Sequence, residues 1–75
     1  MYNEYFKRLN ERDKKDYKRI EKKCNNIYIA HNAYDVLTFI NDYLYDLSDT
    51  VNNNYFLAIC KLEDYYMSIY KKGLK

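Results

Sequence analysis

The sequence predicts an all-α protein: a small antiparallel three-helix bundle with a long, basic, amphipathic first helix. Three observations lead to this fold class. Apolar residues recur at helical spacing through most of the 75 residues, proline is absent and glycine occurs once, and turn-forming residues gather in two short stretches. Helices joined by such short loops pack antiparallel, and a chain of this length makes one domain. Residues 27–30 also fit a short strand, but no second strand is available to pair with it.

The first predicted helix covers residues 3–25. All nine lysines and arginines of the first 24 residues lie on one half of this helix, and most of its apolar side chains lie on the other half. No apolar residue occurs from residue 10 to residue 16. We therefore expect Asp13 and Asp16 to be hydrated or paired with a basic group on a partner, because a buried unpaired carboxylate is costly.

The second predicted helix covers residues 32–48. The break before it falls between residues 25 and 32, where the apolar pattern changes phase and Asn25-Asn26 favours a turn. Asn32 is a suitable N-cap, with Asp35 in the first turn. This segment has the clearest helical pattern of the chain. Its apolar face, with one further residue beyond its end, spans about 120° and comprises Ala33, Val36, Leu37, Ile40, Tyr43, Leu44, Leu47 and Val51.

The third predicted helix covers residues 54–72, and its apolar face spans about 160°. A face this wide predicts burial on two sides, against both other helices or against one helix and a partner chain. The break before this helix is predicted from composition, because Ser, Asp, Thr and Asn favour caps and turns in residues 48–54. A single long bent helix through this region stays open as an alternative.

Composition places the chain in a broad class. No run approaches the length of about 18 apolar residues that a membrane span needs, and the first 15 residues lack the apolar region of a signal peptide, so we expect a cytoplasmic protein that does not enter a membrane. Lys, Asn, Tyr, Ile and Asp are abundant, and their AT-rich codons indicate an AT-rich genome. Such genomes include those of low-GC bacteria, their phages, large DNA viruses and AT-rich protists.

The cysteines and the single histidine of the chain give little support to a catalytic or metal-binding site. Cys24, His31 and Asp35 would share one face of a continuous helix, but the phase change separates them. A spacing of seven residues also separates Cys24 from His31 by about 10 Å along the helix axis, too far for a hydrogen bond between thiol and imidazole. The two cysteines, the second of which is Cys60, are too few for a disulfide scaffold, and we expect buried thiols. One histidine rarely builds a metal site. The prediction is a protein that is not an enzyme and holds no metal or cofactor.

The basic half of the first helix is a candidate surface for nucleic acid or for an acidic partner. Net charge is +4 over residues 1–24, −4 over residues 25–60 and +2 over residues 61–75. Glutamates on the same half dilute the positive field, so a solvated charged surface is the alternative interpretation. The candidate residues are Arg8, Arg12, Lys15, Arg19, Lys22 and Lys23.

A second candidate surface lies on the flank of the second helix, where Tyr34, Asn41, Asp42 and Tyr45 fall outside the core face. Leu57 of the third helix is also predicted to point outward. Tyrosine offers a large contact area at low entropic cost and is enriched in interfaces, so these residues predict a protein-docking surface. The alternative interpretation is that codon bias places tyrosines at the surface without a function.

Together these features predict a small non-enzymatic protein-interaction module. A phage- or virus-encoded accessory protein that acts in the host cytoplasm, and that inhibits or adjusts its partner by steric occlusion, fits this description. The first alternative is a nucleic-acid-binding accessory protein that uses the basic half of the first helix, and the second is a self-associating structural or assembly subunit. In each case we expect a homodimer or a larger complex, because small domains often gain stability by pairing.

Overall fold

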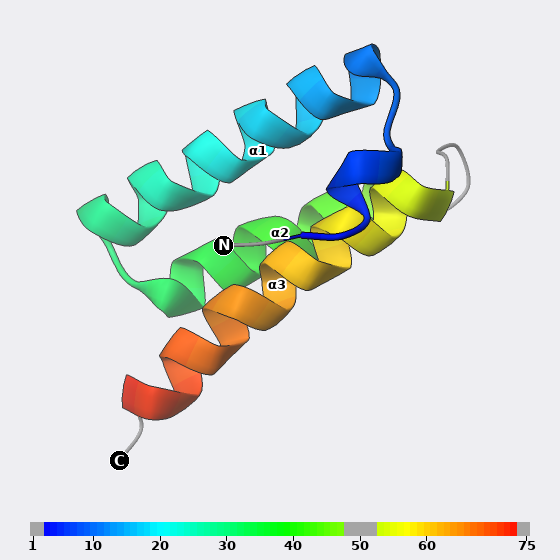
Figure 1. Ribbon diagram of the computed structural model, residues 1–75. Helices are drawn as coiled ribbons and strands as arrows, with labels where there is room; N and C mark the ends of the chain where they lie inside the picture. Colours follow the sequence, from blue (N-terminus) through cyan, green and yellow to red (C-terminus); the bar gives the residue numbers. More distant parts are fainter. Residues whose placement is uncertain (1–2, 48–52, 74–75) are drawn as a thin grey trace.

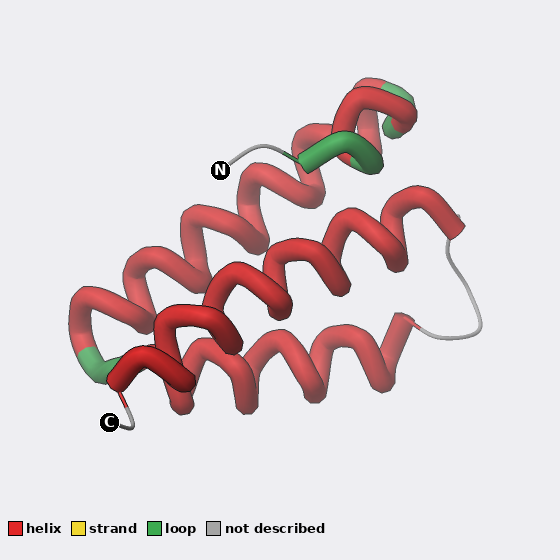
Figure 2. The backbone as a smooth tube through the Cα atoms, turned by 60° about the horizontal axis from the view of Figure 1, so that its bottom comes forward, coloured by secondary structure: helices red, strands yellow, loops and turns green. Residues whose placement is uncertain are grey.

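The computed structural model describes residues 3–47 and 53–73. These residues form a short 3-10 helix, η1 (Phe6–Arg8), and the helices α1 (Glu11–Ala30), α2 (Ala33–Leu47) and α3 (Asn53–Gly73), with no strand among them. The three helices lie side by side, with α2 antiparallel to both α1 and α3 (Figure 1 and Figure 2). The predicted all-α three-helix bundle is thus confirmed.

The first helix begins later than predicted. The chain is extended at Leu9 and Asn10, with ψ near 148° and 172°, and α1 starts only at Glu11. The side-chain oxygen of Asn10 accepts a hydrogen bond of 2.8 Å from the backbone N–H of Asp13, which satisfies a donor that the first helical turn leaves unpaired. The prediction of one helix from residue 3 is therefore wrong, because it counted helical periodicity across a capping residue.

The segment before α1 folds back onto the bundle. Asn3 is buried, and its side-chain amide donates hydrogen bonds of 3.0 Å to the hydroxyl of Tyr17 in α1 and to the backbone carbonyl of Ala58 in α3. Phe6 packs against Tyr17 with ring centres 5.2 Å apart, and Leu9 is buried in the core. Phe6 and Leu9 thus supply apolar packing near the start of α1, where residues 10–16 have no apolar side chain of their own.

The two aspartates that interrupt the apolar pattern lie in the first half of α1 and are half-buried. Asp16 pairs with Arg19 of the same helix, at 3.3 Å between carboxylate and guanidinium. The backbone N–H of Asp13 is bonded within the helix cap. Asp16 therefore finds its basic partner within α1.

The turn between α1 and α2 lies at His31 and Asn32, inside the predicted window. The side-chain oxygen of Asn32 accepts a hydrogen bond of 2.9 Å from the N–H of Asp35, so the predicted cap is confirmed. Residues 25–30, in contrast, continue α1, and the predicted turn at Asn25-Asn26 and the alternative strand at residues 27–30 do not form. Cys24 and Ile27 pack into the core on either side of Asn25 and Asn26, and this burial outweighs the weak helix propensity of the two asparagines.

The core lies where the three helices meet, and α2 and α3 make the most extensive contacts. The hydroxyls of Tyr43 in α2 and Tyr55 in α3 lie 2.6 Å apart and share a hydrogen bond. Because α2 and α3 pack side by side as separate helices, one long bent helix is excluded. The predicted break between them falls largely on residues 48–52, which lie outside the described residues, as does Val51. The largest fully buried side chains are Ile40, Ile59, Leu62, Val36 and Cys24.

Candidate interaction grooves

A pair of tyrosines marks the most exposed aromatic contact between α2 and α3. Tyr34 lies in the first turn of α2 and is 59% exposed, and its ring contacts that of Tyr70 near the end of α3 with ring centres 5.9 Å apart. The antiparallel packing of the two helices brings the start of α2 beside the end of α3. We refer to Tyr34 and Tyr70 as the tyrosine pair.

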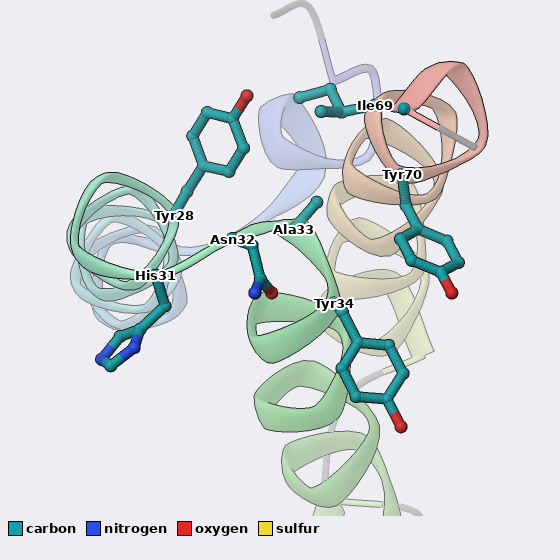
Figure 3. Close-up of a pocket in the computed structure, with 8 residues that line it drawn as sticks. Tyr28, His31, Asn32, Ala33, Tyr34, Ile69 and Tyr70 are labelled. Carbon is teal, nitrogen blue, oxygen red and sulfur yellow. The ribbon is translucent and has the colours of Figure 1, made fainter. Parts of the chain in front are cut away.

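A groove opens at the end of the bundle where the tyrosine pair lies. In Figure 3, Tyr28 from α1 stands on one side, Ile69 and Tyr70 from α3 stand on the other, and Ala33 lies between them. We call this the end groove, and its volume is about 500 Å³. Its lining residues are Tyr28, His31, Asn32, Ala33, Tyr34, Ile69, Tyr70 and Gly73.

Local structure at the α1–α2 turn shapes the end groove. The Asn32 cap starts α2 immediately after the turn, which places the small side chain of Ala33 between the larger side chains of α1 and α3. The imidazole Nδ1 of His31 lies 3.5 Å from a carboxylate oxygen of Asp35, and both groups are exposed to solvent. The rim at the turn is therefore polar, and the two sides of the groove are largely apolar.

A second groove runs between α2 and α3 and shares the tyrosine pair with the end groove. We call it the α2/α3 groove, and its volume is about 300 Å³. Both volumes fall within, or at the lower edge of, the range of about 300–1,000 Å³ that is usual for binding pockets. The residues that line the α2/α3 groove are Tyr34, Leu37, Thr38, Asn41, Glu63, Met67 and Tyr70.

The structure brings together only part of the predicted docking surface. Tyr34 and Asn41 both line the α2/α3 groove. Asp42 and Tyr45 are exposed on α2, Tyr45 at 82%, but line neither groove. Leu57, which is predicted to point outward, is half-buried on α3 and also lies outside both grooves.

Sequence reasoning missed the α1 and α3 sides of these grooves. The apolar patterns of α1 and α3 place Tyr28, Met67, Ile69 and Tyr70 on core faces and so predict burial rather than a role in a groove. A signal was present in the width of the apolar face of α3, which predicted burial on two sides. Part of that wide face instead lines grooves that open to solvent.

The predicted basic surface is divided among different contacts. Arg8 belongs to η1 and lies over the ring of Tyr5, with its guanidinium carbon 5.7 Å from the ring centre. Arg19 is paired with Asp16, and the ammonium group of Lys23 lies 5.2 Å from the ring centre of Phe39 in α2. The remaining residues of the set are exposed on α1 and make no ion pair within the part of the chain that the structure describes: Arg12, Lys15 and Lys22.

The cysteine and histidine side chains lie in different environments. Cys24 is fully buried, and burial raises the pKa of its thiol to about 12, so the reactive thiolate is not populated near neutral pH. Burial also raises the pKa of Cys60, which is half-buried. His31 is exposed at the α1–α2 turn and faces Asp35. Among residues 3–47 and 53–73, no three His, Cys, Asp or Glu side chains are grouped closely enough to hold a metal ion.

None of the helices in the described ranges is both long and apolar enough to cross a bilayer. Comparison with known proteins adds no family: no family model matches the chain, and no curated protein or solved structure shows a significant match to it. The class that the fold defines is a small all-α three-helix bundle, and functional inference rests on its own surfaces.

Proposed function

We propose that this chain is a small non-enzymatic protein-interaction module that docks on a partner protein through the tyrosine pair. The observation that carries the proposal is the position of Tyr34 and Tyr70, exposed or half-buried, at the meeting point of two grooves. Tyrosine side chains at such positions provide large contact areas with few rotatable bonds, and interface hot spots are enriched in them. A partner segment that lies along both grooves would bury the pair at its centre.

The mechanism that we propose is steric occlusion. A bundle of 75 residues that covers a site on a larger protein blocks access to that site without chemistry of its own. The abundance of amino acids with AT-rich codons supports a phage- or virus-encoded accessory protein that acts in the host cytoplasm and inhibits or adjusts its partner.

Affinity capture with matched variants tests the docking surface. We expect Tyr34→Ser to weaken binding of the captured partner by about 30-fold, because a hot-spot side chain contributes about 2 kcal/mol or more. Tyr34→Phe keeps the ring and should retain the partner. Tyr45→Ser removes an exposed tyrosine of the same helix outside both grooves and serves as the control. A partner that all three variants retain equally would place the docking surface elsewhere.

A second copy of the chain is the other protein that can cover these grooves. The homodimer predicted from the sequence would then be the functional state of a structural or assembly subunit. Light scattering coupled to size-exclusion chromatography separates the two cases. A dimer that becomes monomeric with Tyr34→Ser would assign the grooves to self-association, whereas a dimer unaffected by this change leaves them available for a different protein. The nucleic-acid alternative concerns a different surface, the basic half of α1.

A further inference from the structure

The groove between α1 and α3 combines lysines with an exposed aromatic ring. Lys18 and Lys22 from α1 and Tyr65 from α3 line it, and its volume is about 390 Å³. Both lysines are exposed, and Tyr65 is 45% exposed. One acid, Glu21, also lines the groove, so the two lysines leave a net positive lining. We call this the α1/α3 groove.

The tyrosine ring in this groove is held in place by its neighbours. The ring of Tyr65 meets that of the buried Tyr66 nearly at a right angle, 83°, with ring centres 5.1 Å apart. Tyr66 in turn contacts Tyr28 of α1 at 5.9 Å, and Tyr28 is 39% exposed. Three rings therefore run from α3 to α1, with a buried ring in the middle and an exposed ring at each end. Such fixed rings offer stacking faces without a large loss of side-chain entropy on binding.

The charges of the bundle favour a polyanion on this side. The sequence of α2 contains three aspartates and no lysine or arginine, whereas that of α1 contains seven basic and four acidic residues. On α3, Lys61, Tyr65 and Lys72 follow the spacing i, i+4, i+11, which places them on one side of the helix, and both lysines are exposed. A strand that follows the α1/α3 groove would thus pass between lysines of two helices, away from the acidic α2.

We propose that the α1/α3 groove binds single-stranded nucleic acid, with the lysines contacting phosphates and Tyr65 stacking on a base. Sequence-tolerant single-strand sites combine a positively charged groove with aromatic side chains, and both are present here. A duplex would present its phosphates to the lysines but would keep its bases stacked internally, away from Tyr65. This surface lies apart from the tyrosine pair, so the inference goes beyond the proposed docking function and does not depend on it.

Fluorescence anisotropy with labelled oligonucleotides of about 12 nucleotides tests the proposal, since such a length spans a typical single-strand site. We expect the full chain to bind oligo-dT more tightly than a duplex of the same length. The affinity should fall steeply between about 50 and 200 mM salt, because each phosphate contact releases condensed counterions. The absence of single-strand binding, equal binding of the duplex, or binding that does not change with salt would overturn the proposal.

Two matched pairs of variants locate the site. Tyr65→Ser should weaken binding about tenfold through loss of stacking, whereas Tyr65→Phe should bind like the unmodified chain. Lys18→Gln with Lys22→Gln should weaken binding and reduce its salt dependence. Lys15→Gln with Lys71→Gln makes the same change in net charge at exposed positions outside the groove, and should have the smaller effect. Circular dichroism checks that each variant keeps its helices.

Equal effects of the two lysine pairs, or an unchanged affinity of Tyr65→Ser, would show general charge attraction and overturn the assignment of the groove. Competition with poly-glutamate separates nucleic acid from an acidic protein segment. We expect poly-glutamate to displace the oligonucleotide far less effectively than unlabelled oligo-dT does, because it lacks stacking bases. Equal displacement by the two competitors would assign the groove to an acidic protein and reject a nucleic acid.

Discussion

Asn3 connects the N-terminal segment to two helices through a single amide group. Its side-chain nitrogen donates to the hydroxyl of Tyr17 and to the carbonyl of Ala58, and its side-chain oxygen accepts a hydrogen bond of 3.2 Å from the backbone N–H of Tyr5. Buried polar groups are costly when they are left unpaired, so these hydrogen bonds satisfy the buried amide of Asn3 and tie the segment to α1 and α3. A short polar residue that simple hydropathy would place at the surface therefore has a structural role in the core.

We expect Asn3→Ala to lower the free energy of unfolding by about 1–3 kcal/mol, because it removes two hydrogen bonds, one to the buried Tyr17 hydroxyl and one to the Ala58 carbonyl. Urea denaturation followed by circular dichroism measures the change. Asn26→Ala, at an exposed position on α1, is the control and should change stability by no more than about 0.5 kcal/mol. Equal stabilities of the two variants would contradict a structural role for the Asn3 side chain.

At the scale of elements, two asparagine caps set the starts of two helices. Asn10 and Asn32 each accept a hydrogen bond from the backbone N–H three residues further along the chain. The cap at Asn32 could be predicted, because a change in the phase of the apolar pattern coincided with it. The cap at Asn10 could not be predicted in the same way, because the apolar residues before it, Tyr5, Phe6 and Leu9, happen to match the phase of α1.

We expect Asn10→Ala to destabilise the protein by about 1 kcal/mol, since alanine offers no acceptor to the first turn of α1. Asn10→Asp keeps an acceptor and adds a negative charge at the positive end of the helix, so it should retain most of the stability. Thermal unfolding of the two variants makes the comparison. If Asn10→Asp were as unstable as Asn10→Ala, the cap would not explain the start of α1.

At the scale of the whole molecule, buried tyrosines make the stability of the bundle decrease at alkaline pH. Burial raises the pKa of Tyr17 in α1 and of Tyr66 in α3 to about 12, and it also raises the pKa of Tyr55. In the unfolded chain a tyrosine titrates near pH 10. The neutral phenols therefore contribute their full stability below about pH 10, and this contribution is lost as the pH rises through the folded-state pKa values.

We expect the free energy of unfolding to fall between pH 10 and 12, by on the order of 2 kcal/mol for each buried phenol with a pKa of about 12. Urea denaturation at a series of pH values measures the fall. Tyr66→Phe removes one titrating group and should make the fall smaller. Tyr45→Phe removes a hydroxyl at the surface and is the matched control. An identical fall in both variants would show that the hydroxyl of Tyr66 does not contribute.

The two surfaces proposed here lie on different parts of the bundle and involve different helix pairs. The tyrosine pair joins α2 and α3, and the α1/α3 groove carries the lysines and Tyr65. Tyr28 lines the end groove and also belongs to the row of rings beside the α1/α3 groove. Variants at Tyr34 and Tyr65 therefore separate the two proposals, whereas a change at Tyr28 would affect both surfaces.

The candidate sites show where sequence reasoning reached its limit. Tyr34 could be recognised as exposed because the clear periodicity of its own helix excludes it from the core face. Its partner Tyr70 could not, because it lies 36 positions further along the chain and fits a core face of its own helix. The half-burial of Leu57 is of the same kind, since the exposure of a flank residue depends on neighbours that its own helix does not specify.

The sequence by itself determined the three helices, the core face of α2 and the cap at Asn32, because spacing and capping act over three or four neighbouring residues. Only the tertiary structure decided the return of the N-terminal segment, where Asn3 meets Ala58, and the grooves beside Tyr34 and Tyr65. These features depend on how each helix is rotated against the others. That rotation minimises the free energy of side-chain packing over the whole bundle, so no single helix encodes it.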